Sequence, residues 1–242
     1  MQRVQTILLA ILAVIVFVAA GYVIAHNGSG GRSSQQDSFT APTIASATPD
    51  SSSTPADTSP SAAAKKVVVF LGDEWTSGAT ASSKAKRFTT IVATQLGVTE
   101  RNLGKSGSGY ADGADYGSRL DAVVSAHPDV VVVSGGRNDV VAGNGTAADA
   151  SAATLFRDLH RKLPAVVLVA VAPMWGDSNP PSALGDLATA VRKAVTAEGG
   201  TYLDVADPLN GHPEFMADAS DPDDRGYAAI AAALEPKLAP LA

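Results

Sequence analysis

Two kinds of hydrophobic segment alternate along residues 65–242. Short valine-rich runs bounded by glycine or polar residues are typical of strands covered on both faces, and longer segments with apolar residues every three or four positions are typical of helices. Strands are predicted at Val67–Leu71, Val98–Leu103, Val130–Ser134, Val166–Ala170 and Thr201–Asp204. Helices are predicted at Lys86–Leu96, Tyr116–Ala126, Ala147–Leu163, Pro181–Ala197 and Gly226–Leu238, with Gly97 and Gly199 as helix stops. The alternation predicts one α/β domain over residues 65–242, with a central parallel sheet of about five strands between helices.

The N-terminal 25 residues contain a continuous apolar stretch. Thr6–Ala25 carries no charge and has the roughly 20 residues that a helix needs to cross a bilayer, with Arg3 before it. This predicts a transmembrane signal-anchor in residues 1–25, a cytoplasmic N-terminus, an extracytoplasmic C-terminal domain and a cell-membrane location. The alternative is a signal peptide cleaved near Ala25, which would give a secreted protein. The length favours the anchor, because the apolar core of a signal peptide usually has about 7 to 15 residues.

Residues 26–64 differ in composition from the rest of the chain. They are rich in Ser, Thr, Pro and Ala, and Phe39 is their only aromatic residue. Such a segment cannot bury enough apolar surface to fold, so we predict a disordered linker between the anchor and the domain.

Charge and cysteine content narrow the function classes. The 242-residue chain has a formal net charge of -6 and no cysteine. It therefore offers no basic surface for nucleic acid, and disulfides, thiolate nucleophiles and thiolate metal sites are excluded. The sequence GKSGSG at 104–109 lacks the spacing of a phosphate-binding loop. We assign neither a cofactor nor a metal from the sequence.

Three polar motifs lie beside predicted strands or helices. GDEWTSG at Gly72–Gly78 follows the first strand, GGRND at Gly135–Asp139 follows the third, and ADASDPDDRGY at Ala217–Tyr227 leads into the last helix. The carboxyl ends of parallel strands meet at one edge of a sheet, so we expect the three motifs to border one cleft.

Together with NLGKSGSGY at 102–110, these motifs resemble the four sequence blocks of the SGNH (GDSL) hydrolase family, over residues 65–242. The resemblance implies a flavodoxin-like three-layer α/β/α fold and an esterase-type site. It also implies that Asn138 and a backbone N–H of the second block, Gly107 in preference to Gly104, face an oxyanion. Asp218 matches the carboxylate that orients the catalytic histidine in that family.

Two positions depart from the family pattern. Glu74 stands where the family has its nucleophilic serine, and Asp221 stands where it has its histidine. A carboxylate of pKa ~4 is a weak base at neutral pH and a poor nucleophile, so we expect no family-type esterase activity. If the fold follows the family, the Glu74 carboxylate would accept hydrogen bonds from the two oxyanion donors.

The acidic residues Glu74, Asp218 and Asp221 would then crowd together, and their mutual repulsion must be offset. We expect pairing with a nearby basic residue first, from Arg137, Lys105 or Arg225. A bound Ca²⁺ or Mg²⁺ and a raised carboxyl pKa are the alternatives.

The remaining candidates have less specific signals. Asp73, Trp75 and Arg137 are candidate ligand-binding residues because they lie within these motifs. Trp175 is a further candidate because it follows the Val166–Ala170 strand at the same end of the predicted sheet, although packing in the core is an equal alternative. His212 is the one histidine placed to approach the cleft, although a lone loop histidine is more often structural or solvated. We expect Asp139 to accept backbone N–H groups, and Asp223 and Asp224 to begin the last helix.

These observations predict a membrane-anchored extracytoplasmic protein of the SGNH type that is inactive as a serine esterase. It would act as a cell-envelope binding or regulatory module for a glycan, an acyl ester or an envelope protein. The alternative is a hydrolase with a carboxylate-based mechanism that uses Glu74, Asp218 or Asp221 on ester or glycan substrates.

Overall fold

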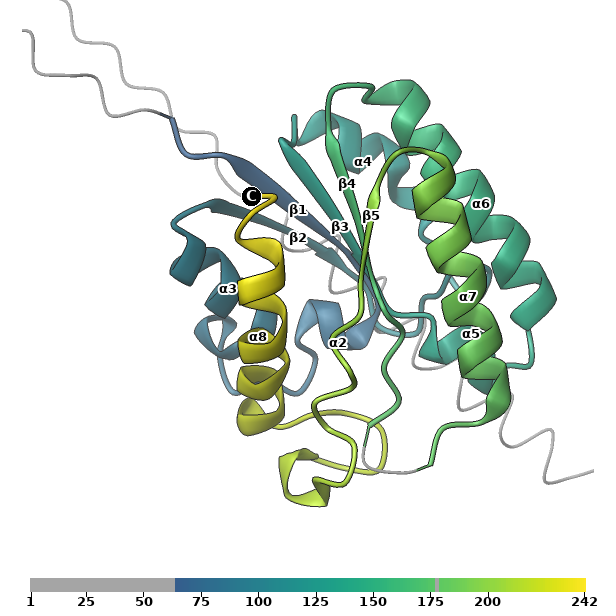
Figure 1. The fold of residues 1–242 in the computed structure, drawn as a ribbon. Coiled ribbons are helices and arrows are strands. Elements are labelled where there is room, and N and C mark those ends of the chain that lie inside the picture. Colours follow the sequence, from purple (N-terminus) through teal and green to yellow (C-terminus); the bar gives the residue numbers. More distant parts are fainter. Residues whose placement is uncertain (1–63, 177–178) are drawn as a thin grey trace, which may run out of the picture. The chain divides into compact units, whose positions relative to one another are not determined.

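The computed structural model describes residues 64–176 and 179–242 (Figure 1). These residues fall within one compact unit, Ser59–Ala242. The predicted anchor and nearly all of the predicted linker lie outside the described residues. Among the helices that are described, none is long and apolar enough to cross a membrane.

A five-stranded parallel sheet forms the centre of the domain. Its strands are β1 (Val67–Gly72), β2 (Thr99–Gly104), β3 (Val130–Ser134), β4 (Val167–Val171) and β5 (Thr201–Leu203). They lie in the order β2-β1-β3-β4-β5, which is the flavodoxin-like order. Gly72 at the end of β1 pairs with Gly104 of β2 and Ser134 of β3, so these three strands end level with one another. The loops that follow them therefore emerge side by side.

Helices cover both faces of the sheet (Figure 1). One face carries α3 (Phe88–Leu96) and α8 (Asp224–Leu238), and the other carries α4 (Leu120–Ser125), α6 (Gly145–Lys162) and α7 (Ser182–Ala197). Successive side chains of a strand point to opposite faces of the sheet, so each strand contributes to both layers. In β1, Val68 and Phe70 pack in the α3/α8 layer, whereas Val69 and Leu71 pack in the α6/α7 layer. The predicted three-layer fold is confirmed.

Two short helices begin where strands end and were not predicted: α2 (Glu74–Ser77) and α5 (Arg137–Val141). They have too few residues to produce a helical hydrophobic period. Two predicted helices also begin later than expected, because the single-turn 3₁₀ helices η1 (Lys84–Lys86) and η2 (Gly117–Arg119) precede α3 and α4. A third 3₁₀ turn, η3 (Pro213–Phe215), precedes α8.

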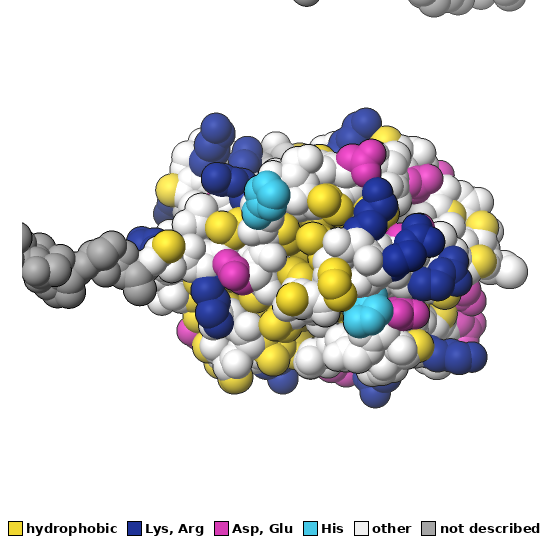
Figure 2. Space-filling model, turned by 90° about the horizontal axis from the view of Figure 1, so that it is seen from above, with side chains coloured by type: hydrophobic (Ala, Val, Ile, Leu, Met, Phe, Trp, Pro, Cys, Tyr) yellow, Lys and Arg dark blue, Asp and Glu magenta, His cyan; other side chains and the backbone are white. Residues whose placement is uncertain are grey.

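The two ends of the sheet differ in character. Seen from above, at the end where the chain enters β1, apolar side chains occupy the middle of the surface and charged ones surround them (Figure 2). The carboxyl ends of the strands, with α2, α5 and the loop before α8, lie at the opposite end of the domain (Figure 1). The candidate site is at that second end.

Candidate functional site

The end of β1 is shaped to start a helix at once. A Cβ on Gly72 would lie 2.1 Å from Thr76 Oγ1 and 2.3 Å from the Ser134 carbonyl oxygen, so only glycine fits there. Asp73 then caps α2, and its Oδ1 accepts hydrogen bonds from the N–H groups of Trp75 at 3.1 Å and Thr76 at 3.4 Å. Glu74 is consequently the first residue of α2, beside the ends of β2 and β3.

Glu74 receives two hydrogen bonds on one oxygen. Its Oε2 accepts from the backbone N–H of Gly107 at 3.0 Å and from Nδ2 of Asn138 at 2.8 Å. Gly107 has a φ of +69°, a conformation that favours glycine, and Asn138 lies in α5 at the end of β3. The choice of Gly107 over Gly104 as the backbone donor agrees with this geometry. Two donors thus converge on the position of an anionic oxygen, and the Glu74 carboxylate fills that position.

The Asp139 side chain anchors the loop that carries Gly107. This fully buried carboxylate accepts the N–H groups of Tyr110 at 2.8 Å, Ala111 at 2.7 Å and Asp112 at 3.1 Å. Burial raises the pKa of Asp139, and the three backbone hydrogen bonds act in the opposite direction. The structural role predicted for Asp139 is confirmed.

Arg119 also supports this loop, a role that no sequence motif predicts. Its Nη1 donates to the carbonyl oxygens of Gly72 at 2.9 Å and Leu103 at 2.5 Å, and its Nη2 donates to Ser108 Oγ at 3.0 Å. Arg119 therefore ties the ends of β1 and β2 to the Gly107 loop. Its partners are carbonyl groups distant in the chain, so no local motif marks it.

The two acids of the last motif have different environments. Asp218 is exposed, and its Oδ1 accepts the N–H groups of Ser220 at 2.7 Å and Asp221 at 2.9 Å, which lowers its pKa. Asp221 is partly buried. Burial raises its pKa, and the negative charges of Glu74 and Asp218 raise it further. Of Asp218 and Asp221, Asp221 therefore retains a proton more readily.

The expected pairing of a basic residue with these acids is wrong. Within residues 64–176 and 179–242, no ion pair joins Arg137, Lys105 or Arg225 to Glu74, Asp218 or Asp221. The Arg137 guanidinium instead lies over the Trp175 ring, 5.0 Å from its centroid, and Arg225 binds Asp223 at 2.7 Å. Arg137 still lowers the pKa of Asp218 and Asp221 through its charge. The raised pKa of Asp221 is the alternative that the structure supports.

Two of the predicted ligand-binding residues are interior residues. Asp73 is 3% exposed and Trp75 is 4% exposed. Asp73 caps α2, as described above, and Nε1 of Trp75 donates to the Ser220 carbonyl oxygen at 3.0 Å, joining α2 to the last motif. Both predictions are corrected, because neither side chain is open to a ligand. Arg137 and Trp175 are partly exposed and stay candidates.

His212 does not take the place of the missing base. Its Nδ1 lies 2.9 Å from Glu214 Oε1, and its ring stacks on Phe215 with centroids 4.8 Å apart. The acids at the start of α8 are structural, as predicted: Asp223 accepts the N–H groups of Arg225 and Gly226, and Asp224 binds Ser82. In the described part of the chain, no group of three or more His, Asp or Glu residues could hold a metal ion.

Comparison with known proteins places this geometry in a family. Residues 70–229 match the family model described as the GDSL-like lipase/acylhydrolase family. A comparison with curated proteins returns no match.

Solved structures resemble the domain closely in fold and weakly in sequence. A protein of the G-D-S-L family from Desulfitobacterium hafniense has 15% identity and a TM-score of 0.61, covering 71% of this chain and 98% of its own. The aryl esterase of M. smegmatis has 15% identity and a TM-score of 0.59, covering 73% and 100%. A family two carbohydrate esterase from Cellvibrio japonicus has 17% identity and a TM-score of 0.60, covering 75% and 63%. With its five-stranded sheet and the matched motifs, this chain belongs to the GDSL-like (SGNH) lipase/acylhydrolase family.

Proposed function

We propose that this protein is a non-catalytic member of its family, which uses the hydrolase scaffold as a binding or regulatory module of the cell envelope. The observation that carries the proposal is the Glu74 carboxylate bound to both Gly107 and Asn138. An ester carbonyl would need these same two donors while its carbon is attacked. With Glu74 in place, the donors are already satisfied and the position of the nucleophile is filled.

The chemistry of the replacement residues supports the same conclusion. Acyl transfer of the serine type requires a hydroxyl nucleophile and a neighbouring base that is neutral near pH 7. Glu74 supplies no hydroxyl. Asp221 occupies the histidine position, and burial and neighbouring acids raise its pKa. Unlike an imidazole, however, its carboxyl has no N–H through which Asp218 could orient it. Both the hydroxyl that would give up a proton and the oriented base that would accept it are therefore missing.

The proposed ligand is a cell-envelope glycan, an acyl or acetyl ester, or an envelope protein, bound beside Arg137 and Trp175. The Trp175 ring and the Arg137 guanidinium stack on each other, and both are partly exposed, so they offer an apolar face with a positive charge. Carbohydrate and aryl ester substrates are named for two of the similar structures. The apolar segment Thr6–Ala25 supports anchoring in the membrane, with the domain on its outer side.

A hydrolase with a carboxylate-based mechanism is the second candidate, and the raised pKa of Asp221 favours it. A carboxyl of raised pKa with a second carboxyl near it resembles the acid and base pairs of glycoside hydrolysis. Its difficulty is that Glu74 Oε2 already accepts hydrogen bonds from two donors, so this oxygen is not free to accept a proton from a substrate or a water molecule.

A gain-of-function experiment tests the proposal. The purified chain should hydrolyse neither short acyl esters nor acetylated sugars above background. Glu74→Ser combined with Asp221→His should restore measurable esterase activity, because Gly107, Asn138 and Asp218 match the family motifs. Glu74→Ser combined with Asp221→Asn is the matched control, which creates the hydroxyl without the base and should stay inactive. Robust hydrolysis by the unmodified chain, with labelling by serine-directed phosphonates, would contradict the proposal.

A further inference from the structure

The described part of the chain contains two asparagines that are followed by glycine, in the pairs Asn144–Gly145 and Asn210–Gly211. The asparagine side chain in such a pair is open to attack by the backbone nitrogen of the next residue, because glycine has no side chain to shield that nitrogen. The attack requires a mobile asparagine side chain and a following peptide bond that is free to turn. The two pairs differ in both requirements.

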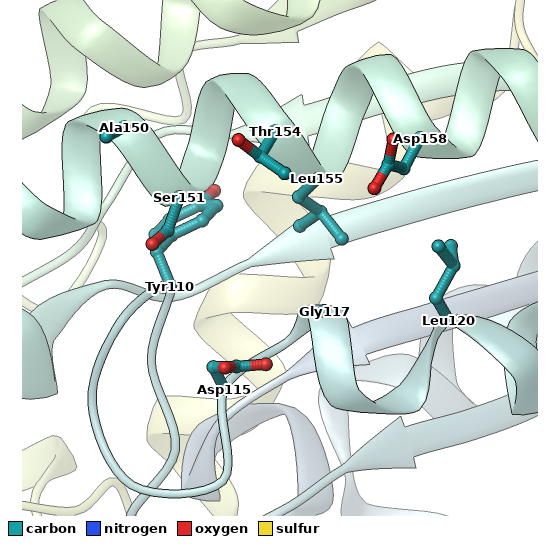
Figure 3. Close-up of a pocket in the computed structure, with 9 residues that line it drawn as sticks. All are labelled: Tyr110, Asp115, Gly117, Leu120, Ala150, Ser151, Thr154, Leu155 and Asp158. Atoms are coloured by element: carbon teal, nitrogen blue, oxygen red, sulfur yellow. The ribbon is translucent and has the colours of Figure 1, made fainter.

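The side chain of Asn144 is held by a neighbouring loop. Its Nδ2 donates a hydrogen bond to Asp112 Oδ1 at 3.3 Å, and the residue is half-buried. Asp112 belongs to the loop that joins Tyr110 to Asp115 beside α6 (Figure 3). Turning the Asn144 amide toward the backbone would therefore break the contact between this loop and the start of α6.

The backbone of Asn144 is fixed as well. Its N–H donates to the Asp139 carbonyl oxygen at 2.8 Å, and its own carbonyl oxygen accepts the Ala148 N–H at 2.9 Å. The second of these bonds is the first hydrogen bond of α6, and it sets the orientation of the peptide bond to Gly145. The Gly145 nitrogen can reach the Asn144 side chain only if the first turn of the helix opens.

Asn210 has neither restraint. Asn210 and Gly211 are exposed, and in the described structure no hydrogen bond involves the Asn210 side chain or the Gly211 N–H. The turn is closed by a hydrogen bond from the His212 N–H to the Leu209 carbonyl oxygen at 3.0 Å. Gly211 has a φ of +81°, and a Cβ at this position would meet no atom beyond its chain neighbours within 4 Å. The Gly211 nitrogen is therefore unpaired and accessible to the neighbouring side chain.

We propose that Asn210 is a site of spontaneous deamidation and that the fold protects Asn144 from the same reaction. The Gly211 nitrogen, after giving its proton to hydroxide, attacks Asn210 Cγ and closes a succinimide ring. The Cγ–Nδ2 bond breaks, and the leaving nitrogen takes a proton from water, which releases ammonia and regenerates hydroxide. Water then adds to one of the two ring carbonyl carbons and opens the ring to aspartate or isoaspartate. Either product adds one negative charge, and isoaspartate also inserts a methylene group into the main chain.

The segment before this turn is anchored, so we expect the modified chain to stay folded. Leu209 is fully buried, and its N–H donates to Asp207 Oδ1 at 3.2 Å. The new carboxylate is two residues before His212, whose Nδ1 is 2.9 Å from Glu214 Oε1. Deamidation thus adds charge to an exposed and already acidic loop. The proposal does not depend on the role of the candidate site.

The test is incubation of the full chain at pH 8.5 over several weeks, followed by digestion at mildly acidic pH and mass spectrometry of the peptides that contain each pair. Asn210 should convert at least tenfold faster than Asn144, and isoaspartate should be detected at residue 210 by an isoaspartyl methyltransferase. The control is the same chain unfolded in guanidinium chloride, where the two pairs should convert at rates that agree within a few-fold. Gly211→Ala should slow conversion of Asn210 at least tenfold and leave Asn144 unchanged.

Two results would overturn the proposal. One is conversion of Asn144 as fast as Asn210 in the folded chain, and the other is an intact Asn210 in the folded chain when the unfolded chain converts readily. A decrease of more than a few degrees in the melting temperature of the converted protein would contradict the confinement of the change to the turn. Ester turnover by the unmodified chain would leave this proposal intact while contradicting the proposed function, so the two failures are distinguishable.

Discussion

Glu74→Ala removes the acceptor shared by Gly107 and Asn138, and its effect on stability can be worked out from the contacts. A hydrogen bond to a charged group contributes roughly 1.5 to 3 kcal/mol, and both bonds go to one carboxylate oxygen. Gly107 is exposed and Glu74 and Asn138 are half-buried, so solvent replaces part of this contribution. Removing Glu74 also relieves its repulsion of Asp73 and Asp221. The expected net destabilisation is about 1 to 2 kcal/mol.

Urea unfolding at pH 7 measures this loss, and a thermal scan should show a decrease in Tm of roughly 2 to 8 °C. Acetate supplies the missing carboxylate. It should raise the Tm of Glu74→Ala in a saturable way and leave the unmodified protein unaffected. Glu74→Gln, which keeps an acceptor oxygen but loses the charge, should fall between the two proteins and respond weakly to acetate. A Glu74→Ala protein as stable as the original, with no response to acetate, would refute the assignment of Glu74 to the two donors.

Two further predictions concern the acids beneath the site. Burial, followed by the charge of Glu74, raises the pKa of Asp73 from 3.8 to about 7. The folded state therefore keeps this proton over a pH range in which the unfolded state has released it, and this contribution to stability is lost as pH rises from about 4 to 7. Asp73→Asn can still cap α2, and it should remove this part of the dependence of the unfolding free energy on pH. Urea titrations at several pH values measure that dependence. An unchanged slope of unfolding free energy against pH would contradict the raised pKa. Asp139→Ala leaves the buried N–H of Tyr110 and the partly buried N–H groups of Ala111 and Asp112 without their acceptor, and it should destabilise the fold by about 2 to 4 kcal/mol. Faster amide exchange at Gly107 is the expected local signature.

The sequence predicted the sheet well because its strands are buried on both faces. Continuous valine runs such as Val130–Ser134 leave little choice of structure, and the observed strand has the predicted bounds. The position of Glu74 beside Gly107 and Asn138 was predictable for another reason: the motifs of one family sit at fixed places at the strand ends. The short helices α2 and α5 were not predictable, since four or five residues carry no period.

Contacts between residues far apart in the sequence were the second kind of feature that could not be predicted. Arg137 is next to Asn138 in sequence, which suggested a charge partner for the acids, but its guanidinium stacks on Trp175. Arg119 reaches carbonyl groups 16 and 47 residues away. Burial of Asp73 and Trp75 likewise depends on how α2 packs against the last motif, which local sequence does not encode.

The most direct test of the central claim compares ester turnover by the unmodified chain and by Glu74→Ala, at equal folded concentration and at several pH values. If Glu74 occupies the donor pair without taking part in catalysis, neither protein will hydrolyse short acyl esters or acetylated sugars above background. If Glu74 is a catalytic group, the unmodified chain will show turnover that Glu74→Ala abolishes, and the account given for this site will be contradicted.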